Sequence, residues 1–510
     1  MNGLPLISIM LAVPLLGAAW TLAGGAGARW IGMLAAGATF ALSAALWVGH
    51  VPGGPAFQFE ERVAWLPDLG ISYHVGIDGV SLLLALLTTV FVPIALVASA
   101  TTVTTRVREF VALVLVLEFA ILGALVSLDL FGFYVFFELM LVPTFLLVGI
   151  WGGARRAAAA MQFFLYTMVG SVAMLVGIIA LGRSRGTFDY VELQASLARP
   201  GGALSGTDEM WLFVAFALAF AIKVPLVPMH SWLPEAYVQA PLPVTVLMSS
   251  VMVKVGAYGF LRFCLGLFPG AAQEASWVVA LLATIGIVYG ALVASRQRDL
   301  KRLVAWSSIS HLGFVMLGLV AATTEAIQGS VIQMVNHGVS TGALFLLVGM
   351  LHERARTWAI DQFGGVARAM PAFGAALVLV VFSSAGLPFT NGFTGEFLIL
   401  IGTFRSPATH LQAFAIVGAT GVVLGALYLL RMYRKVMQGP VNPAFISPGG
   451  DGPQRVTIAD LTGREACLLA PLAVLIFWIG VYPKPFLDQT APAARTVAAA
   501  VGGEAGKAPR

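Results

Sequence analysis

Four charged residues lie deep inside long apolar stretches of this sequence: Glu138, Lys223, Lys254 and Glu396. An ionised side chain at the centre of a bilayer costs roughly 2.5–3.5 kcal/mol on insertion scales, so such residues usually face a polar interior and carry ions or protons. The pattern therefore indicates a membrane protein that moves protons through titratable side chains.

Three further titratable residues extend this series. Glu118, in VLVLEFAILG, is a candidate second carboxylate, while His311, in AWSSISHLGF, and His337, in IQMVNHGVSTG, are candidate relay groups. Histidine changes charge near neutral pH, and the neighbouring Ser310 and Asn336 can hold ordered water. The alternative is that each histidine is a buried structural residue.

Glu138 has no basic residue within its own apolar stretch, so a partner must come from another segment, and Lys223 is the natural candidate. Burial disfavours a charged ammonium and a nearby carboxylate favours it, which makes such a pair a switchable proton carrier. A purely structural ion pair is the alternative. Lys254 lies too deep to reach either membrane surface, and its alternative role is packing against carbonyls at a helix end.

The composition independently indicates a polytopic membrane protein. Of 510 residues, 59% are apolar and 10% are charged, with a mean hydropathy of +0.91, whereas soluble domains carry about 25% charged residues. Cys264 and Cys467 stand alone in apolar runs, so no metal or redox cofactor is expected on this chain. The first apolar run has no basic residue before it and no clear cleavage site, which favours a retained helix over a signal peptide.

A spanning helix needs about 20 apolar residues, and the chain divides into about fourteen such units, which predicts an all-α fold. They lie near residues 4–23, 30–49, 78–100, 110–127, 130–151, 161–181, 211–238, 243–268, 276–294, 303–321, 326–351, 371–404, 409–430 and 465–482. Lys and Arg gather in alternate loops, which places that side in the cytoplasm and both termini outside. The net charge of +5 is therefore explained by topology, and no nucleic-acid partner is expected.

Two predicted spans, the seventh and the twelfth, contain residues that interrupt a helix. The seventh contains Pro225, Pro228 and Pro234, and the twelfth contains Gly386 and Pro388. A proline removes a backbone donor and clashes with the preceding turn, so both helices must break. A matched pair of interrupted segments five spans apart indicates two five-helix inverted repeats with a site at each break.

The chain therefore divides into four parts. Residues 1–103 hold helices 1–3, residues 104–270 the first repeat, residues 271–437 the second repeat, and residues 438–510 helix 14 and a tail. Within this scheme His230 and Glu235 are expected to shape the first break. Arg262, near the outer end of helix 8, is expected to extend its charge to the membrane surface.

The stretch IKVPLVPMHSWLPEAYVQAP (222–241) resembles the broken seventh helix of the antiporter-like subunits of respiratory complex I and of their Mrp antiporter relatives. The motifs FFELMLVP around Glu138, MVKVGAYG around Lys254 and SSISHLGF around His311 resemble the same family. The resemblance covers about helices 3 to 13 and implies fourteen helices in two inverted repeats. It also implies that Glu138 and Lys223 form a modulating pair, that Lys254 and the histidines form a central axis, and that Glu396 is the terminal site.

Glutamate at position 396 resembles the middle antiporter-like subunit of complex I, since lysine is usual there in the other members and in Mrp chains. That resemblance implies a multi-pass subunit of the bacterial inner membrane whose partners are neighbouring antiporter-like subunits, lipids and protons. Electron transfer between NADH and quinone would occur on other chains. Two alternatives remain open: an Mrp-type sodium/proton antiporter subunit, and a structural or quinone-binding scaffold.

Overall fold

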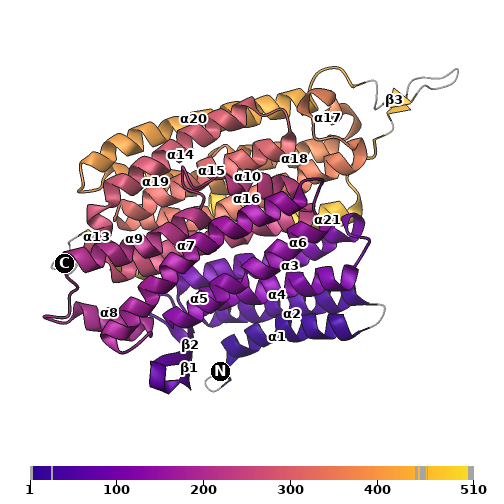
Figure 1. Ribbon diagram of the computed structural model, residues 1–510. Coiled ribbons are helices and arrows are strands. Elements are labelled where there is room, and N and C mark those ends of the chain that lie inside the picture. Colours follow the sequence, from indigo (N-terminus) through magenta and orange to yellow (C-terminus); the bar gives the residue numbers. More distant parts are fainter. Residues whose placement is uncertain (1–3, 25–26, 443–445, 448–454, 457, 503–510) are drawn as a thin grey trace.

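Helices that lie side by side and nearly parallel make up most of the chain (Figure 1). The indigo N-terminal helices lie at the bottom of this view and the orange α20 (His410–Met437) at the top, while α21 (Gly463–Val481) lies between them at the right. The computed structural model describes residues 4–24, 27–442, 446–447, 455–456 and 458–502. The mainly helical membrane architecture expected from the composition is confirmed.

The N-terminal part consists of three helices and one β-hairpin. Its elements are α1 (Leu6–Ala23), α2 (Ala28–Gly49), β1 (Gln58–Leu66), η1 (Pro67–Leu69), β2 (Ile71–Ile77) and α3 (Gly79–Thr102). The strands pair antiparallel, and Gly70 turns the chain between them at a φ of 71°, which favours glycine. The sequence analysis assigned this segment only to an outer loop and did not predict the hairpin.

The next part contains the helices that carry Glu118, Glu138, Lys223 and Lys254. In chain order they are α4 (Val107–Val126), α5 (Leu130–Leu139), α6 (Leu141–Trp151), α7 (Arg156–Arg185), α8 (Tyr190–Ala198), α9 (Gly206–Lys223), α10 (Trp232–Gln239), α11 (Leu242–Leu247), η2 (Met248–Met252), α12 (Val253–Gly259) and η3 (Phe260–Leu265). The last four elements form one continuous rod, in which η2 and η3 are π-helical turns.

The remaining helices carry the two histidines and Glu396. They are α13 (Pro269–Glu274), α14 (Ser276–Arg296), α15 (Leu300–Val320), α16 (Thr324–Ala355), η4 (Ile360–Gln362), α17 (Val366–Ala369), α18 (Pro371–Ser384), α19 (Asn391–Phe404), α20 (His410–Met437), α21 (Gly463–Val481) and α22 (Lys484–Val501). Two short strands, β3 (Ile446–Ser447) and β4 (Arg455–Val456), pair antiparallel between α20 and α21.

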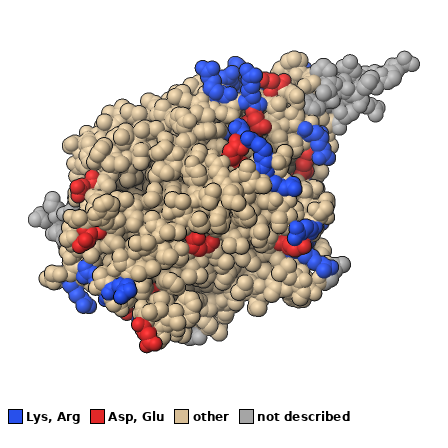
Figure 2. Space-filling view, in the orientation of Figure 1, with Lys and Arg blue, Asp and Glu red and all other residues tan. Residues whose placement is uncertain are grey.

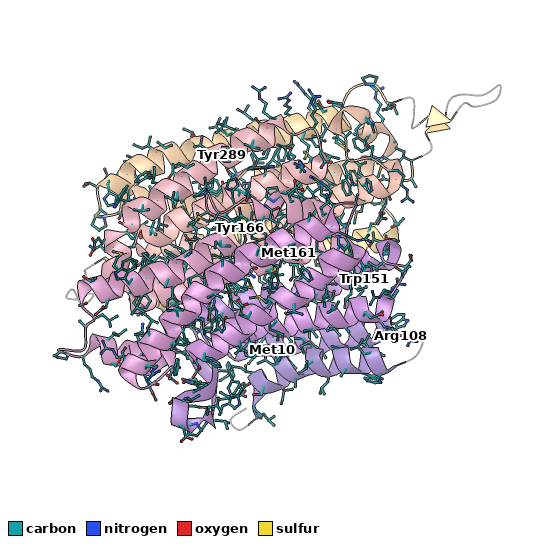
Figure 3. The ribbon with its side chains drawn as sticks, in the orientation of Figure 1. Met10, Arg108, Trp151, Met161, Tyr166 and Tyr289 are labelled. Carbon is teal, nitrogen blue, oxygen red and sulfur yellow. The ribbon has the colours of Figure 1, made fainter. Side chains whose placement is uncertain are left out.

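Twelve helical segments of the described chain are long and apolar enough to cross a membrane. They coincide with twelve of the predicted spans, with α5 and α6 counted as one crossing. The two other predicted spans are the interrupted segments, α9 with α10 and α18 with α19. Arg108, from one of the predicted basic loops, and Trp151 lie at the same end of the molecule, at the right of Figure 3.

Both predicted interruptions are present, and they have the same backbone geometry. In the first, the Leu226 amide donates to the Ala221 carbonyl over 2.8 Å, and in the second the Leu387 amide donates to Phe382 over 3.0 Å. The residue before each leucine, Pro225 or Gly386, has a positive φ. Two segments with little sequence identity thus adopt the same turn.

A second pair of matching features lies at opposite ends of the molecule. Asp129 caps α5 and forms an isolated antiparallel bridge with Asp189, whereas Asp299 caps α15 and forms one with Ala359. The two bridges join residues at the same sequence separation. The first lies beside α8 at the left of Figure 1, and the second lies near α17 at the right.

One helix beyond the last predicted span was missed. The helix α22 has one apolar face and one polar face, and it packs against α16 and α3. Because its apolar residues are not continuous, it was not recognised as a span. Gln489 of α22 also lies 2.5 Å from His50 at the end of α2. The segment at 438–510, predicted as helix 14 and a tail, therefore contains a second ordered helix.

His74 of β2 anchors the hairpin to the helices. Its Nδ1 lies 2.5 Å from the Asp189 carboxylate and its Nε2 lies 3.1 Å from Glu60. Burial opposes the charged imidazolium, but the hydrogen bonds to these carboxylates outweigh burial and raise the pKa of His74 above 6.5. The two carboxylates therefore favour the charged form of the histidine that anchors the hairpin.

We expect the attachment of the hairpin to weaken as pH rises. A raised folded-state pKa gives a stabilisation that is complete below 6.5 and is lost as pH rises through the raised value. Hydrogen exchange of residues 58–77, corrected for intrinsic rates, should therefore accelerate at alkaline pH. A His74→Gln variant should lose that pH dependence, and an unchanged dependence in this variant would contradict the assignment.

Candidate functional site

Four of the predicted site residues form a continuous row through the interior. The Lys254 ammonium lies 2.8 Å from Nδ1 of His337, and the rings of His337 and His311 are 5.8 Å apart between centroids. His311 Nδ1 lies 2.8 Å from the Glu396 carboxylate. All four side chains are at least nine-tenths buried. The row therefore places three bases in sequence and ends at one acid.

Lys254 lies on a helix whose backbone hydrogen bonding is irregular on both sides of it. It lies in α12 between the π-helical turns η2 and η3, and its ammonium donates to the Ser249 carbonyl one turn earlier. π-Helical turns are uncommon and concentrate at functional sites. The alternative role, packing of the lysine against helix carbonyls, is thus present together with the contact to His337.

Glu396 lies in the second turn of α19, directly after the second break. Its carboxylate accepts a 3.1 Å hydrogen bond from Gln333 as well as facing His311. A β-carbon on Gly386 would lie only 3.1 Å from the same carboxylate. The backbone of the second break therefore lies close to the Glu396 carboxylate. On the other side of the imidazole, the Tyr428 hydroxyl lies 3.4 Å from Nε2 of His311.

Lys223 is the last residue of α9, where the first break begins. Its ammonium lies 5.0 Å from the Phe137 ring centre and 5.6 Å from that of Phe163. Gly256 of α12 leaves room for its stem, since a β-carbon there would lie 2.8 Å from the lysine β-carbon. The side chain is thus buried against aromatic rings.

Glu138 does not pair directly with Lys223. Within the described residues no ion pair joins them, although Glu138 is close enough to act on the ammonium electrostatically. Glu138 is also half-buried near the end of α5, whereas Lys223 is fully buried. The predicted pair is therefore coupled electrostatically without a direct ion pair, and the Lys223 ammonium lies against the rings of Phe137 and Phe163.

Glu118 lies at the middle of α4 and is completely buried. Neither of its carboxyl oxygens has a hydrogen-bond partner among the described residues. It stands apart from the row that contains Lys254. The structure thus leaves the predicted second carboxylate isolated.

A network of amides and hydroxyls lies beside the row and was missed by the sequence analysis. Asn336 donates to the Asn391 backbone carbonyl over 2.6 Å, and Ser340 and Ser383 share a 2.6 Å hydrogen bond. Ser383 also donates to the Asn391 side chain. These groups join α16 to both sides of the second break. Their spacing at one helical turn in α16 was the available signal, since Gln333, Asn336 and Ser340 share a face.

The polar groups of the first break play the expected structural part. Glu235 accepts from Arg155 and from Arg302, which ties α10 to α7 and α15. Tyr166, labelled in Figure 3, shares a 2.6 Å hydrogen bond with Ser231 in the break. His230 packs between aromatic rings, and its Nδ1 has no hydrogen-bond partner in the described chain.

Lys301 is a buried cation that the sequence analysis assigned only to a basic loop. Its ammonium donates to the Val238 and Ala240 carbonyls, so it caps the C-terminal end of α10. The charge lies at the start of a span, where a lysine is usually exposed. Only the three-dimensional position of α10 explains its burial.

The expectation that Arg262 reaches the membrane surface is wrong. Its guanidinium forms a 2.6 Å ion pair with Asp78 at the start of α3, and both side chains are nearly buried. It also lies over the rings of Phe57, Tyr190 and Tyr258. The nearby carboxylate supplies an internal partner, so the side chain has no need to extend outward.

We expect an Asp78→Asn substitution to destabilise the protein by about 3–5 kcal/mol, because it leaves the buried Arg262 charge without its partner. The change should lower the denaturant midpoint of the purified protein. Replacing both residues, as Asp78→Asn with Arg262→Met, should recover part of the loss. A single variant as stable as the parent would show that the pair contributes little.

No group of three or more His, Cys, Asp or Glu side chains in the described chain is arranged to hold a metal ion. Both cysteines lie in apolar runs that predict burial, but only Cys264 of η3 is buried, whereas Cys467 is exposed on α21.

Comparison with known proteins identifies the family. The sequence pattern of the membrane subunits described as NADH:quinone oxidoreductase/Mrp antiporter matches residues 127–425, more than half of the chain. The chain is 42% identical over 472 residues to NADH-quinone oxidoreductase subunit M of Rhodobacter capsulatus, covering 91% of this chain and 89% of that protein. The chain belongs to this family.

Solved structures of the NADH:quinone oxidoreductase/Mrp antiporter family share the fold. A chain of respiratory complex I from Thermus thermophilus, solved with bound NADH, superposes with a TM-score of 0.85 at 32% identity, covering 97% of this chain and 99% of that one. The Mrp complex from Dietzia superposes with a TM-score of 0.82 at 23% identity over 97% of this chain and 52% of its own, which shows a common fold.

Proposed function

We propose that this chain is a proton-translocating membrane-arm subunit of an NADH:quinone oxidoreductase. Its relatives over nearly the whole length are complex I subunits. The row from Lys254 to Glu396 is the observation that carries the proposal, because buried titratable groups in contact are expensive to keep without a transport role. Electrons pass through other subunits, and this chain supplies the proton path.

The row supports a stepwise transfer. A protonated Lys254 donates its proton to Nδ1 of His337, and His337 releases a proton from Nε2, which has no protein partner among the described residues. His311 receives it through one bridging water, and its Nδ1 proton passes to the Glu396 carboxylate. Each step leaves one donor neutral and one acceptor protonated. Lys223 and Glu138 act on the row as distant charges. Glu118 is a second buried carboxylate of the first repeat.

The architecture we propose has fourteen crossings and two inverted five-helix repeats, residues 104–270 and 271–437. Counting the two interrupted segments adds two crossings to the twelve continuous ones. The matched turns at the breaks support an internal repeat, and the matched bridges at opposite ends support its inversion. An even number of crossings, together with the alternate basic loops of the sequence, supports a topology with both termini on the periplasmic side of a bacterial inner membrane.

Two other functions fit the findings less well. An Mrp-type sodium/proton antiporter subunit shares the fold, but its structural match is only 23% identical. A scaffold without transport leaves the buried charges at Lys223 and Lys254 without a purpose, since isolated charge in a membrane gives a scaffold no advantage. Complex I membership explains both the relatives and the charges.

Affinity purification of the tagged chain from its source cells tests this function. We expect it to recover the flavin and iron–sulfur subunits that oxidise NADH, together with NADH-driven proton uptake after reconstitution into vesicles. Recovery with cation-antiporter subunits alone, and sodium-driven proton exchange in place of NADH-driven uptake, would overturn the proposal in favour of the antiporter.

A further inference from the structure

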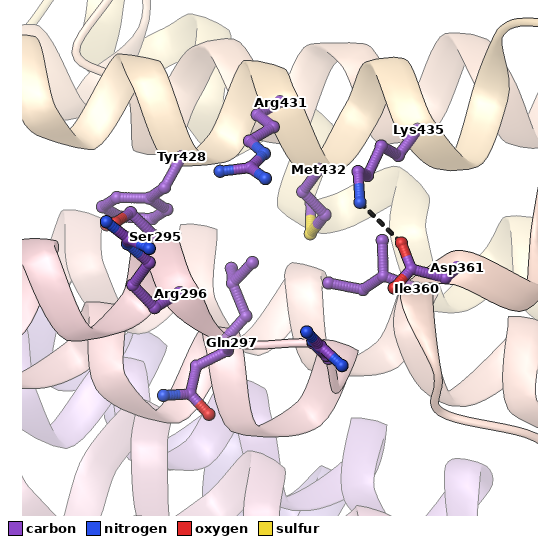
Figure 4. Close-up of a pocket in the computed structure, with 11 residues that line it drawn as sticks. Ser295, Arg296, Gln297, Ile360, Asp361, Tyr428, Arg431, Met432 and Lys435 are labelled. Carbon is purple, nitrogen blue, oxygen red and sulfur yellow. Dashed lines mark hydrogen bonds and ion pairs between the residues drawn. The ribbon is translucent and has the colours of Figure 1, made fainter.

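A cavity of about 440 Å³ lies where the basic ends of α14 and α20 meet the loop at η4. Figure 4 shows Arg431 and Lys435 projecting into it from α20, with Arg296, Gln297 and Asp361 on the opposite wall. A space of this size is sufficient for a small charged group. Tyr428 lines this cavity and also contacts His311 at 3.4 Å, so the cavity adjoins the proton row at that residue.

The walls of this cavity carry an excess of positive charge. Arg296, Arg298, Arg431 and Lys435 face one carboxylate, Asp361, so the balance is three positive charges. Lys435 pairs with Asp361 at 2.5 Å, but the guanidinium groups of Arg296, Arg298 and Arg431 have no ion pair or side-chain hydrogen bond within the described residues. Like charges gathered in this way repel one another unless an anion joins them.

The cavity opens onto a second, mostly apolar hollow of about 480 Å³. The two share Ser295, Tyr428 and Arg431, and the second is lined further by Leu424, Leu427 and Leu430 of α20. Leu427 is 60% exposed on the outer face of this membrane-spanning helix. A free anion would leave this hollow unfilled, whereas a lipid tail would cover it. Lys and Arg gather at the upper edge of the molecule in Figure 2, above a broad uncharged surface.

We propose that the end of α20 binds one anionic phospholipid, with its phosphate among Arg296, Arg298 and Arg431 and an acyl chain along Leu424, Leu427 and Leu430. Basic pockets between spanning helices at the cytoplasmic surface suit acidic headgroups, and the guanidinium fork matches phosphate oxygens. The positive charge of the arginines favours an anionic headgroup. The leucines favour a lipid over a soluble phosphate, because an acyl chain can cover them.

Photolabelling of the intact complex that contains this chain tests the site. The probes are phosphatidylglycerol and phosphatidylcholine that carry the same diazirine-bearing acyl chain, added to the detergent-purified complex. We expect phosphatidylglycerol to label residues 424–435 in strong preference to phosphatidylcholine. An Arg296→Gln/Arg431→Gln variant should weaken this labelling roughly 30-fold, since each basic residue near anionic lipid contributes about fivefold.

Two further variants separate the site from general charge and from folding. Arg296→Lys/Arg431→Lys keeps both charges and should retain most labelling, while Arg108→Gln/Arg156→Gln removes two exposed arginines elsewhere and should label as the parent does. Equal labelling by both lipids, or undiminished labelling of the glutamine variant, would overturn the proposal. If the glutamine variant fails to assemble, the comparison of lipids on the parent and on the lysine variant still decides it. Labelling of a neighbouring subunit packed over α20, with none on α20 itself, would also overturn it.

Discussion

A Lys223→Met variant is expected to assemble normally and to lose most of its proton pumping, because the row then lacks a buried positive charge that acts on it electrostatically. Methionine fills the space of the lysine stem against Phe137, Phe163 and Gly256 but has no charge. Because no anion contacts the ammonium within the described residues, the change leaves no partner unpaired and should not lower the free energy of unfolding.

The measurement is NADH-driven acidification of reconstituted vesicles, reported by a pH-sensitive dye, with electron transfer recorded in parallel. A Glu138→Gln variant should show a similar loss, since both charges act on the same row. Arg108→Gln, an exposed cation outside the site, serves as the matched control and should pump normally. Full pumping by an assembled Lys223→Met enzyme would show that Lys223 is a structural residue.

The sequence was sufficient to predict features that depend on one segment alone. Runs of apolar residues located the spans, because hydrophobic length is a local property. Pro225 and Gly386 located both breaks, since each disrupts the helix that contains it. Lys254, His311 and Glu396 were found because charge in an apolar stretch is visible without any knowledge of packing.

Features that depend on contacts between distant segments were beyond the sequence. Arg262 was expected at the membrane surface, but Asp78, almost two hundred residues earlier, holds it inside. Lys301 looked like part of a basic loop until the position of α10 placed carbonyls at its ammonium. Glu138 and Lys223 carry opposite charges that suggest a pair, yet the lysine ammonium lies against the rings of Phe137 and of Phe163, which comes from a further helix, α7.

The order of the residues in the row also depends on contacts between distant segments, so only the structure reveals it. Two histidines in neighbouring spans indicate a relay only when their rings face one another. The hydrogen bonds from Lys254 to His337 and from His311 to Glu396 fix that arrangement. The network at Asn336 and Asn391 also needs α16 beside the second break, which no local pattern specifies.

Glu396→Gln is expected to reduce proton pumping at least about tenfold while electron transfer and assembly persist. An amide retains the shape of the side chain and can still accept hydrogen bonds from Gln333 and His311, but it cannot take the proton that His311 Nδ1 delivers. The expected loss therefore comes from proton transfer and not from packing.

Two substitutions at the same position distinguish these causes. Glu396→Asp restores a titratable carboxyl group at a greater distance from His311 and should recover part of the pumping, with an altered pH profile that a purely structural residue would not produce. Glu396→Lys is expected to be partly tolerated, because a neutral lysine can accept a proton from His311 and the resulting ammonium can pass it on. Normal pumping by Glu396→Gln, or an aspartate variant no better than the glutamine variant, would place the terminal acid of the row elsewhere.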